Sequence, residues 1–288
     1  MAASLSLQLW QRADRHRRLL LVACQGYLVL MALYDAWVWA SKAGRLPSIY
    51  LPIYGLYLVV GALEMQFVHI VWHLQQRYRL LNRLKTQRDR LKAGVKYEKI
   101  RAYSSNGNYT PNQQLLILHS LCDIHAELYD AVDAVNSAYG FQILVHTLSI
   151  FLHCIISPYF FLLNLLYPMT YGQTDPAFLS LQLMWILIHV SKLFLVVQPC
   201  SATCNEAKKT GSIVVKLLNV ELQLPMKRQL EVFAMQLIHR NVEFSAFGFC
   251  NLDFPLIASI AGAVTTYLVI LIQFQNSDTG STPNNPAN

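Results

Sequence analysis

The chain has 288 residues, of which 54% are hydrophobic and only 14% are charged, with a formal net charge of +7. Soluble domains carry about 25% charged residues, and the mean hydropathy here is +0.32. This composition excludes an ordinary soluble domain and predicts an all-α, polytopic membrane protein with about five transmembrane helices. No Lys/Arg run accompanies a nucleic-acid fold signature, so we expect no nucleic-acid partner.

The first 74 residues predict a charged N-terminus followed by two membrane spans. Residues 1–18 hold a cluster of arginines but no following cleavage site, which favours a cytoplasmic flank over a signal peptide. Residues 19–74 contain two transmembrane helices, 19–40 and 49–74. Glu64 lies near the middle of the second. A carboxylate at that depth is either functional or a hydrogen-bonded packing residue, and both readings stay open.

Residues 75–140 predict a cytoplasmic helical hairpin that serves as an anchor. Its first arm, 75–101, is rich in Lys and Arg, and a polar loop at 102–112 contains the glycosylation sequon of Asn108. The second arm, 113–140, places four acidic residues on one broad face: Asp123, Glu127, Asp130 and Asp133. We expect the two arms to pack antiparallel, with their charges setting the register.

The second half of the chain predicts three further spans. Residues 141–197 contain two transmembrane helices, 141–166 and 177–197. Residues 198–252 form cytoplasmic anchor helices, at 214–222 and 225–249. Residues 253–275 form the last transmembrane helix, and the polar residues 276–288 form a disordered extracellular tail.

The positive-inside rule then orients the chain. If the N-terminus and the two anchor regions share one side, every Lys and Arg except Lys42, Arg45 and Lys192 lies there. The N-terminus is therefore predicted to be cytoplasmic and the C-terminus extracellular, since the number of spans is odd.

Motifs for enzymatic or metal chemistry are not evident in the sequence. His69 and His73 have a metal-compatible spacing, but no glutamate of the zinc-protease type lies between them and no third ligand is apparent. We read them as packing residues. No nucleophile elbow, phosphate loop or dinucleotide fingerprint is present, so we expect neither an enzyme nor a cofactor.

The last apolar run, which begins at Phe254, contains four polar residues at membrane depth: Thr265, Thr266, Tyr267 and Gln273. Polar side chains at that depth face a protein partner or water. Residues seven apart nearly eclipse on a helix, so Thr266 and Gln273 share one face, with Ile270 beside them. This face predicts either helix–helix contacts or the wall of a pore.

The residues Thr266–Phe274 follow the order Thr-Tyr, five hydrophobic residues, Gln-Phe. This order resembles the last transmembrane helix of the insect gustatory receptor family, within the superfamily of insect chemoreceptor ligand-gated channels. Three more patterns follow in family order: Leu74-x-x-Arg77-Tyr78-x-x-Leu81-Asn82; His119-x-Leu121 followed by Val135-Asn136-x-x-Tyr139-Gly140; and Gly248-Phe249-x-x-Leu252-Asp253. The resemblance covers nearly the whole chain.

The resemblance implies a tastant-gated cation channel of the plasma membrane in chemosensory neurons, built as a homo- or heterotetramer. The pore and gate residues would be Thr266, Tyr267, Ile270, Gln273 and Phe274, the last two at the outer gate. The ligand pocket would be lined by Tyr34, Trp37, Tyr54, Tyr57, Tyr159, Phe160, Gln182 and Trp185. Its ligand would be a small tastant such as a sugar or a bitter alkaloid. Its other partners would be permeating cations, further subunits and membrane lipid.

Family members have seven spans, and the five predicted here correspond to a chain without the first two. A non-conducting or truncated partner subunit is therefore an alternative. A small multi-pass carrier is a second alternative, because five ionisable residues lie at membrane depth: Glu64, His146, His153, His189 and Lys192.

Overall fold

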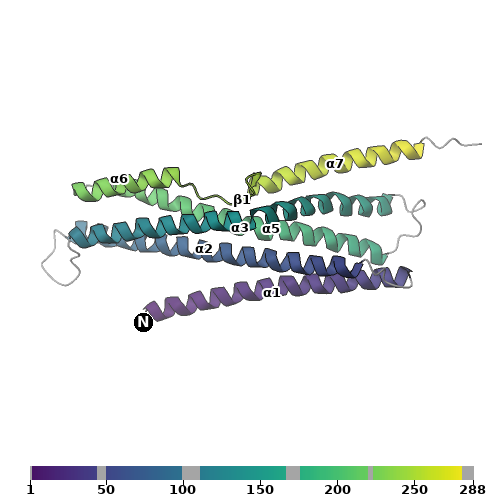
Figure 1. Ribbon diagram of the computed structural model, residues 1–288, viewed down its shortest axis with the longest axis horizontal. Helices are drawn as coiled ribbons and strands as arrows, with labels where there is room; N and C mark the ends of the chain where they lie inside the picture. The colour runs from purple at the N-terminus through teal and green to yellow at the C-terminus, as the bar shows by residue number, and fades with distance from the viewer. Residues whose placement is uncertain (1, 44–49, 99–110, 167–175, 220–222, 281–288) are drawn as a thin grey trace, which may run out of the picture. The chain divides into compact units, whose positions relative to one another are not determined.

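The computed structural model describes residues 2–43, 50–98, 111–166, 176–219 and 223–280. Its elements in chain order are α1 (Ala2–Ala43), α2 (Tyr50–Glu98), α3 (Pro111–Leu166), α5 (Pro176–Leu218), α6 (Leu224–His239), β1 (Ser245–Ala246), β2 (Cys250–Asn251) and α7 (Phe254–Gly280). Figure 1 shows these long helices. Five helices are long and apolar enough to cross a membrane, which confirms the predicted polytopic, all-α class.

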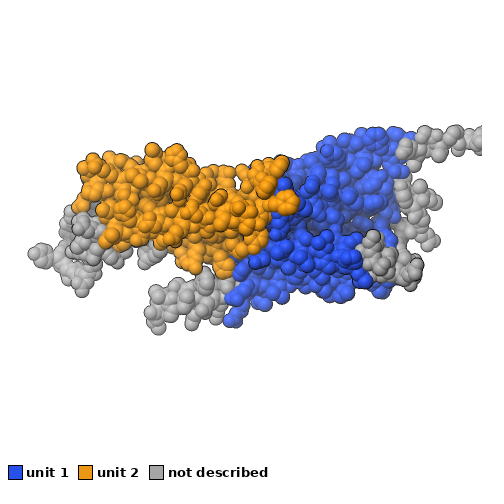
Figure 2. Space-filling model, viewed as in Figure 1, with its two compact units in different colours: residues 1–69, 142–197, 254–288 blue, residues 70–141, 198–253 orange. Residues whose placement is uncertain are grey.

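The chain divides into two compact units, coloured blue and orange in Figure 2. Unit 1 comprises residues 1–69, 142–197 and 254–288, and unit 2 comprises residues 70–141 and 198–253. The predicted sequon at Asn108 lies outside the described residues.

Unit 1 is held together by two apolar clusters. In the first, Leu28, Met31 and Val38 of α1 pack against Leu181 and Ile188 of α5. In the second, residues of α3 and α5 receive one edge of α7: Ile150, Cys154, Leu193 and Val197 meet Leu256, Ile257, Ile260 and Val264. Each fully buried aliphatic side chain contributes about 1.5–3 kcal/mol. These clusters therefore place α7 against α3 and α5.

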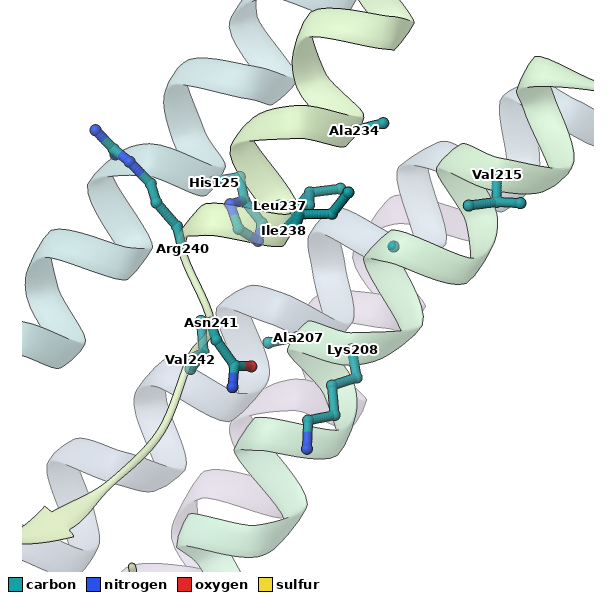
Figure 3. Close-up of a pocket in the computed structure, with 11 residues that line it drawn as sticks. His125, Ala207, Lys208, Val215, Ala234, Leu237, Ile238, Arg240, Asn241 and Val242 are labelled. Carbon is teal, nitrogen blue, oxygen red and sulfur yellow. The ribbon is translucent and has the colours of Figure 1, made fainter.

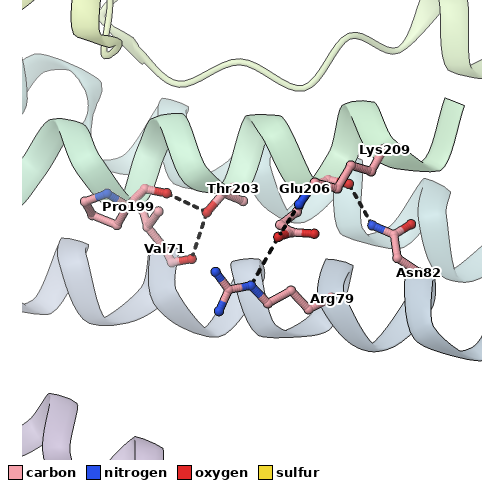
Figure 4. A network of polar contacts seen from close by, with 7 residues as sticks. All are labelled: Val71, Arg79, Asn82, Pro199, Thr203, Glu206 and Lys209. Atoms are coloured by element: carbon pink, nitrogen blue, oxygen red, sulfur yellow. Dashed lines mark hydrogen bonds and ion pairs between the residues drawn. The ribbon is translucent and has the colours of Figure 1, made fainter. Parts of the chain in front are cut away.

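Unit 2 joins α2 to α5 through polar side chains (Figure 4). The Asn82 amide donates to the Glu206 carbonyl at 2.8 Å. The same amide accepts from the Thr210 hydroxyl at 2.8 Å. The Arg79 guanidinium meets the Glu206 carboxylate at 3.3 Å. Asn82 and Thr210 are buried, so these hydrogen bonds satisfy groups that would otherwise be costly to bury. Asn82 belongs to a sequence pattern noted above, and its function here is to join two helices.

Helix α5 runs without a break from Pro176 to Leu218, through Pro199. The predicted helical stretch at 214–222 therefore belongs to α5 as far as Leu218, and residues 220–222 lie outside the described residues. The Thr203 hydroxyl donates to the Pro199 carbonyl at 2.7 Å and to the Val71 carbonyl of α2 at 3.3 Å. These contacts pack α5 against α2 one turn beyond the proline, where its ring disturbs the helical hydrogen bonding.

The predicted acidic face of 113–140 is solvent-facing. Asp123, Glu127, Asp130 and Asp133 are all exposed. Asp130 lies 3.7 Å from Arg240, the residue after α6. The side chains of 84–98 in the basic arm are outside the described residues, so the predicted pairing of the two arms stays a prediction.

A tight hairpin replaces the end of the predicted helix 225–249. Helix α6 ends at His239, and Arg240 leaves helical geometry at φ −106° and ψ 69°. The strands β1 and β2 pair antiparallel, Ser245 with Asn251 and Ala246 with Cys250. The turn between them needs positive φ at Phe247 (53°) and Gly248 (76°), which a helix cannot contain. At the other end of the chain the predicted tail was partly wrong, because α7 continues to Gly280.

The hairpin packs on α3 through Asn136 and Gly140. The Asn136 amide donates to the Glu243 carbonyl at 2.8 Å and accepts from the Ser245 backbone N–H at 3.2 Å. A Cβ atom added at Gly140 would lie only 3.2 Å from the Phe247 nitrogen. Two separated sequence patterns, one around Asn136 and one around Gly248, therefore meet at one contact that fixes the chain just before α7.

We predict that Asn136→Ala destabilises unit 2, because it leaves a backbone donor and acceptor of the hairpin without a protein partner. A typical hydrogen bond contributes about 0.5–1.5 kcal/mol net, and neither of these two is fully buried. Thermal unfolding of the purified protein in detergent measures the change. Asn164→Ala on the same helix is the matched control, since its amide makes only a local, exposed bond to the Phe160 carbonyl. Equal stability of the two variants would contradict the prediction.

Candidate functional site: the last helix and an aromatic cluster

Helix α7 presents two different faces. Leu256, Ile257, Ile260 and Val264 pack into unit 1, and Leu268, Leu271 and Ile272 continue as half-buried residues. The predicted gate residues Thr266, Tyr267, Ile270, Gln273 and Phe274 are all exposed in the single chain. Successive helical residues are about 100° apart, so the five residues occupy one side about a third of a turn wide. The structure brings all five predicted gate residues to one face.

The hydroxyl groups of Thr266, on this face, and of its neighbour Thr265 are satisfied within the helix. Thr265 and Thr266 donate to the carbonyls of Ala261 and Gly262, at 2.8 and 3.0 Å. The amide of Gln273 is exposed. A primary amide is costly to place in hydrocarbon. In a membrane this face therefore requires water or another protein surface.

Tyr267 lies at the border between the two faces of α7. Its ring contacts Phe151 of α3, edge to face, with centroids 6.2 Å apart, although 51% of the residue is exposed. Phe274 is 68% exposed.

The predicted ligand-pocket residues form a cluster near α1, α2 and α5 of unit 1. The Tyr34 hydroxyl shares a hydrogen bond of 2.8 Å with Ser180. The Tyr54 hydroxyl donates to Asp35 at 2.6 Å. Asp35 is buried and also accepts hydrogen bonds from Trp39 and Trp185. One carboxylate therefore gathers donors from three helices.

A second part of the cluster is built around Tyr57. Its hydroxyl lies 2.7 Å from His153 Nε2, and its ring packs against Trp185 with centroids 5.5 Å apart. Trp185 stacks on His189 at 5.7 Å and 20°. Tyr57 and Trp185 are thus in direct contact, and two histidines extend the cluster that the sequence predicted.

The remaining predicted pocket residues lie elsewhere in unit 1 or at its surface. Trp37 stacks on Tyr34 but is 61% exposed. Tyr159 packs against its neighbour Phe160, which is 45% exposed. Gln182 is half-buried on α5. A ligand function of all these residues stays a prediction.

Sequence reasoning missed Asp35, His153 and His189 as members of the aromatic cluster. The histidines were predicted only as ionisable residues at membrane depth. The contacts of Asp35 with Tyr54 and of His153 with Tyr57 depend on how the helices pack, which no local pattern reports. The stack of Trp185 on His189 is four residues apart on α5, and this spacing could have found it.

Three of the ionisable residues at membrane depth meet in unit 1. The Glu64 carboxylate of α2, only 1% exposed, lies 3.2 Å from Lys192 Nζ of α5 and 3.1 Å from His146 Nε2 of α3. A buried charge needs such compensation. Among the described residues, no group of three or more His, Cys, Asp or Glu has an arrangement that could hold a metal ion.

Unit 2 contains a cavity of about 230 Å³ between α5 and α6 (Figure 3). Its lining includes apolar Val215, Leu237 and Ile238 together with Lys208 and Arg240. The Arg240 guanidinium also lies over the Tyr129 ring, 5.5 Å from its centroid. No residue predicted as gate or pocket contributes to this cavity.

Five long apolar helices, with a last helix that exposes polar side chains, define a polytopic helical membrane protein. The family model described as 7tm Chemosensory receptor matches residues 4–277, and the chain belongs to this family. The resemblance found in the sequence is thereby confirmed.

Several relatives are gustatory receptors of Drosophila melanogaster. The gustatory receptor for sugar taste 43a is 28% identical over 257 residues, which cover 80% of this chain and 59% of that protein. The gustatory and pheromone receptor 32a is 27% identical, and the match covers 88% of this chain and 56% of that protein. The chain spans about half the length of the curated relatives it matches.

A solved structure has a similar fold. The insect olfactory receptor OR5 from Machilis hrabei in complex with eugenol superposes with a TM-score of 0.64 at 13% identity. The match covers 93% of this chain and 70% of that one. At this identity the likeness concerns the fold alone.

Proposed function

We propose that the chain is a subunit of a gustatory receptor that works as a tastant-gated cation channel. The observation that carries the proposal is the exposed face of α7, on which Thr266, Gln273 and Phe274 lie together. An amide and a phenyl ring one residue apart suit a gate, because the ring can exclude water and the amide can replace part of a cation's hydration shell.

The tastant would bind in the aromatic cluster of unit 1. Tyr34, Tyr57 and Trp185 offer flat apolar surfaces beside hydroxyl, imidazole and carboxylate groups. Ligand sites are commonly built this way, from an apolar lining with a few polar groups that fix orientation. Trp37, Tyr54, Tyr159, Phe160 and Gln182 complete the proposed lining.

Assembly into a tetramer is the second part of the proposal. Val232, Met235 and Ile238 of α6 are 51%, 60% and 74% exposed and lie on one side of the helix. Exposed apolar patches of this kind favour contact with another protein surface. A second copy of the chain, or a longer relative, would cover this face in the cytoplasmic anchor.

The orientation follows from the charges. We propose that residues 1–18, 75–140 and 198–252 are cytoplasmic and that α7 ends outside the plasma membrane. The cytoplasmic side would then hold Arg77, Arg79 and Arg83 of α2 together with Lys208 and Lys209 of α5.

A partner subunit that assembles without conducting is the alternative within the same family, since the match covers only 59% and 56% of the sugar receptor 43a and receptor 32a. The carrier hypothesis loses support because Glu64, Lys192 and His146 form a closed, charge-compensated group.

Orientation is tested with epitope tags. A tag after Asn288 should bind antibody on intact cells, and a tag at 104–108 should bind only after permeabilisation. The positive-inside rule gives this result. The reverse labelling would contradict both the orientation and the channel proposal.

Assembly is tested by single-particle imaging of the purified protein, alone and co-expressed with a full-length relative. We expect four-fold particles or mixed tetramers. Ile238→Asp should dissociate them, because it places a charge in the apolar contact, and Ile238→Leu should leave them intact. Monomers alone in both preparations would contradict this part of the proposal.

The gate is tested by electrophysiology on the same assemblies. Phe274→Ala should raise ligand-independent current by shrinking the apolar constriction, and Gln273→Ala should alter conductance or ion selectivity. Leu268→Ala, on the half-buried edge of α7, is the matched control and should change expression only.

The proposal fails if an assembly conducts but neither variant changes it. Basal current would then be unaltered with Phe274→Ala and permeation unaltered with Gln273→Ala, so the pore would not pass these residues. An assembly that forms but never conducts would favour the partner-subunit alternative.

A further inference from the structure

Both ring nitrogens of His153 have a hydrogen-bond partner. Its Nδ1 lies 2.8 Å from the Ser149 carbonyl, which can only accept, so Nδ1 carries a proton. Its Nε2 shares a hydrogen bond of 2.7 Å with the Tyr57 hydroxyl. These two contacts hold the ring of His153 in place.

His189 is packed against this fixed ring without hydrogen bonds of its own. The two imidazole centroids are 4.3 Å apart, and the Trp185 indole also stacks on His189. His189 is only 3% exposed, and among the described residues neither of its ring nitrogens has a hydrogen-bond partner. A buried polar group without a partner is rare and requires an explanation.

A lysine adjoins His189 on the same helix. Lys192 follows one helical turn later on α5, and its charge acts on His189. The carboxylate of Glu64 is already engaged by Lys192 and His146. A proton on His189 would therefore be buried beside a lysine with no acceptor to receive it.

The other titratable groups of this region do not supply the missing acceptor. Ionisable side chains from four helices face the aromatic cluster or the Glu64–Lys192–His146 group. They are Cys24 and Asp35 from α1, Tyr57 and Glu64 from α2, His146, His153 and Cys154 from α3, and His189 and Lys192 from α5. Asp35 is occupied by Tyr54, Trp39 and Trp185. The packed arrangement is thus compatible with an uncharged His189 only.

We propose that His189, together with the ion-paired Glu64–Lys192–His146 cluster, forms a proton-dependent clasp that holds α2, α3 and α5 together only while His189 is uncharged. Acidification protonates His189, and the helices separate at Trp185 to let the charge reach water or a counter-ion. The clasp makes the packing of unit 1 sensitive to pH. This regulation goes beyond the proposed channel function and does not depend on it.

The sign of the effect follows from proton linkage. An imidazole in water takes up its proton near pH 6.5, and the packed state excludes that proton. The packed state is therefore stable above about pH 6.5 and loses stability as the pH falls further. With one proton taken up on opening, the ratio of opened to packed protein rises about tenfold for each pH unit below that value.

The test uses the purified full chain in lipid nanodiscs between pH 8 and pH 5, with no current measured. Tryptophan fluorescence follows the stacking of Trp185 on His189, and thermal unfolding follows the packing. We expect both to change together below about pH 6.5. His189→Phe keeps a stacked ring that cannot be protonated, so it should remove the fluorescence change and flatten the pH dependence of unfolding.

Two further variants make the result decisive. If His189→Phe does not fold, His189→Gln replaces it, with the same expectation. His119→Phe, a histidine of unit 2, should behave as wild type.

The variant His146→Gln tests whether the pH dependence comes from His146 and not from His189. Two results would overturn the proposal. One is a stability that rises as the pH falls. The other is a pH dependence of unfolding that persists in His189→Phe and disappears in His146→Gln.

Discussion

The carboxylate of Glu64 lies between Lys192 and His146, and the packing of unit 1 depends on that contact. It is 1% exposed and at membrane depth, where an uncompensated charge would cost several kcal/mol. Its two partners come from different helices, so α2, α3 and α5 can approach only in the register that brings all three together. That register also sets His189 against His153 and Trp185, and it places α3 and α5 to receive the apolar edge of α7.

Asparagine side chains have the corresponding role in unit 2. Asn82 joins α2 to α5, and Asn136 fixes the hairpin between α6 and α7 onto α3. Each asparagine amide is a hydrogen-bond donor and an acceptor at once. Since hydrogen bonds are directional, these two contacts fix the relative position of their elements more strictly than apolar packing would. Gly140 has no side chain between α3 and the turn, so the turn can approach α3 closely.

Much of the architecture was predictable because bilayer thickness is a strong constraint. Runs of about 20 apolar residues specify spanning helices wherever they occur. The spans at 19–40, 141–166 and 177–197 lie within described helices, as do residues 50–74 of the second span. The prediction that was wrong at 240–249 depended on a weaker signal. Those residues are apolar enough to continue an amphipathic helix, but positive φ angles at Phe247 and Gly248 form a turn there.

The sequence by itself determined the class of protein, its family and the polar face of the last helix, because hydropathy, helical periodicity and a spaced motif are local properties. Residues 266–274 share a face in any helix. Only the tertiary structure decided which side chains meet. Trp185 of α5 reaches Asp35 of α1, and Tyr57 of α2 meets His153 of α3, and both contacts join residues far apart in the chain. Their energies come from burial and pairing across the bundle, which depend on the packing of the whole chain.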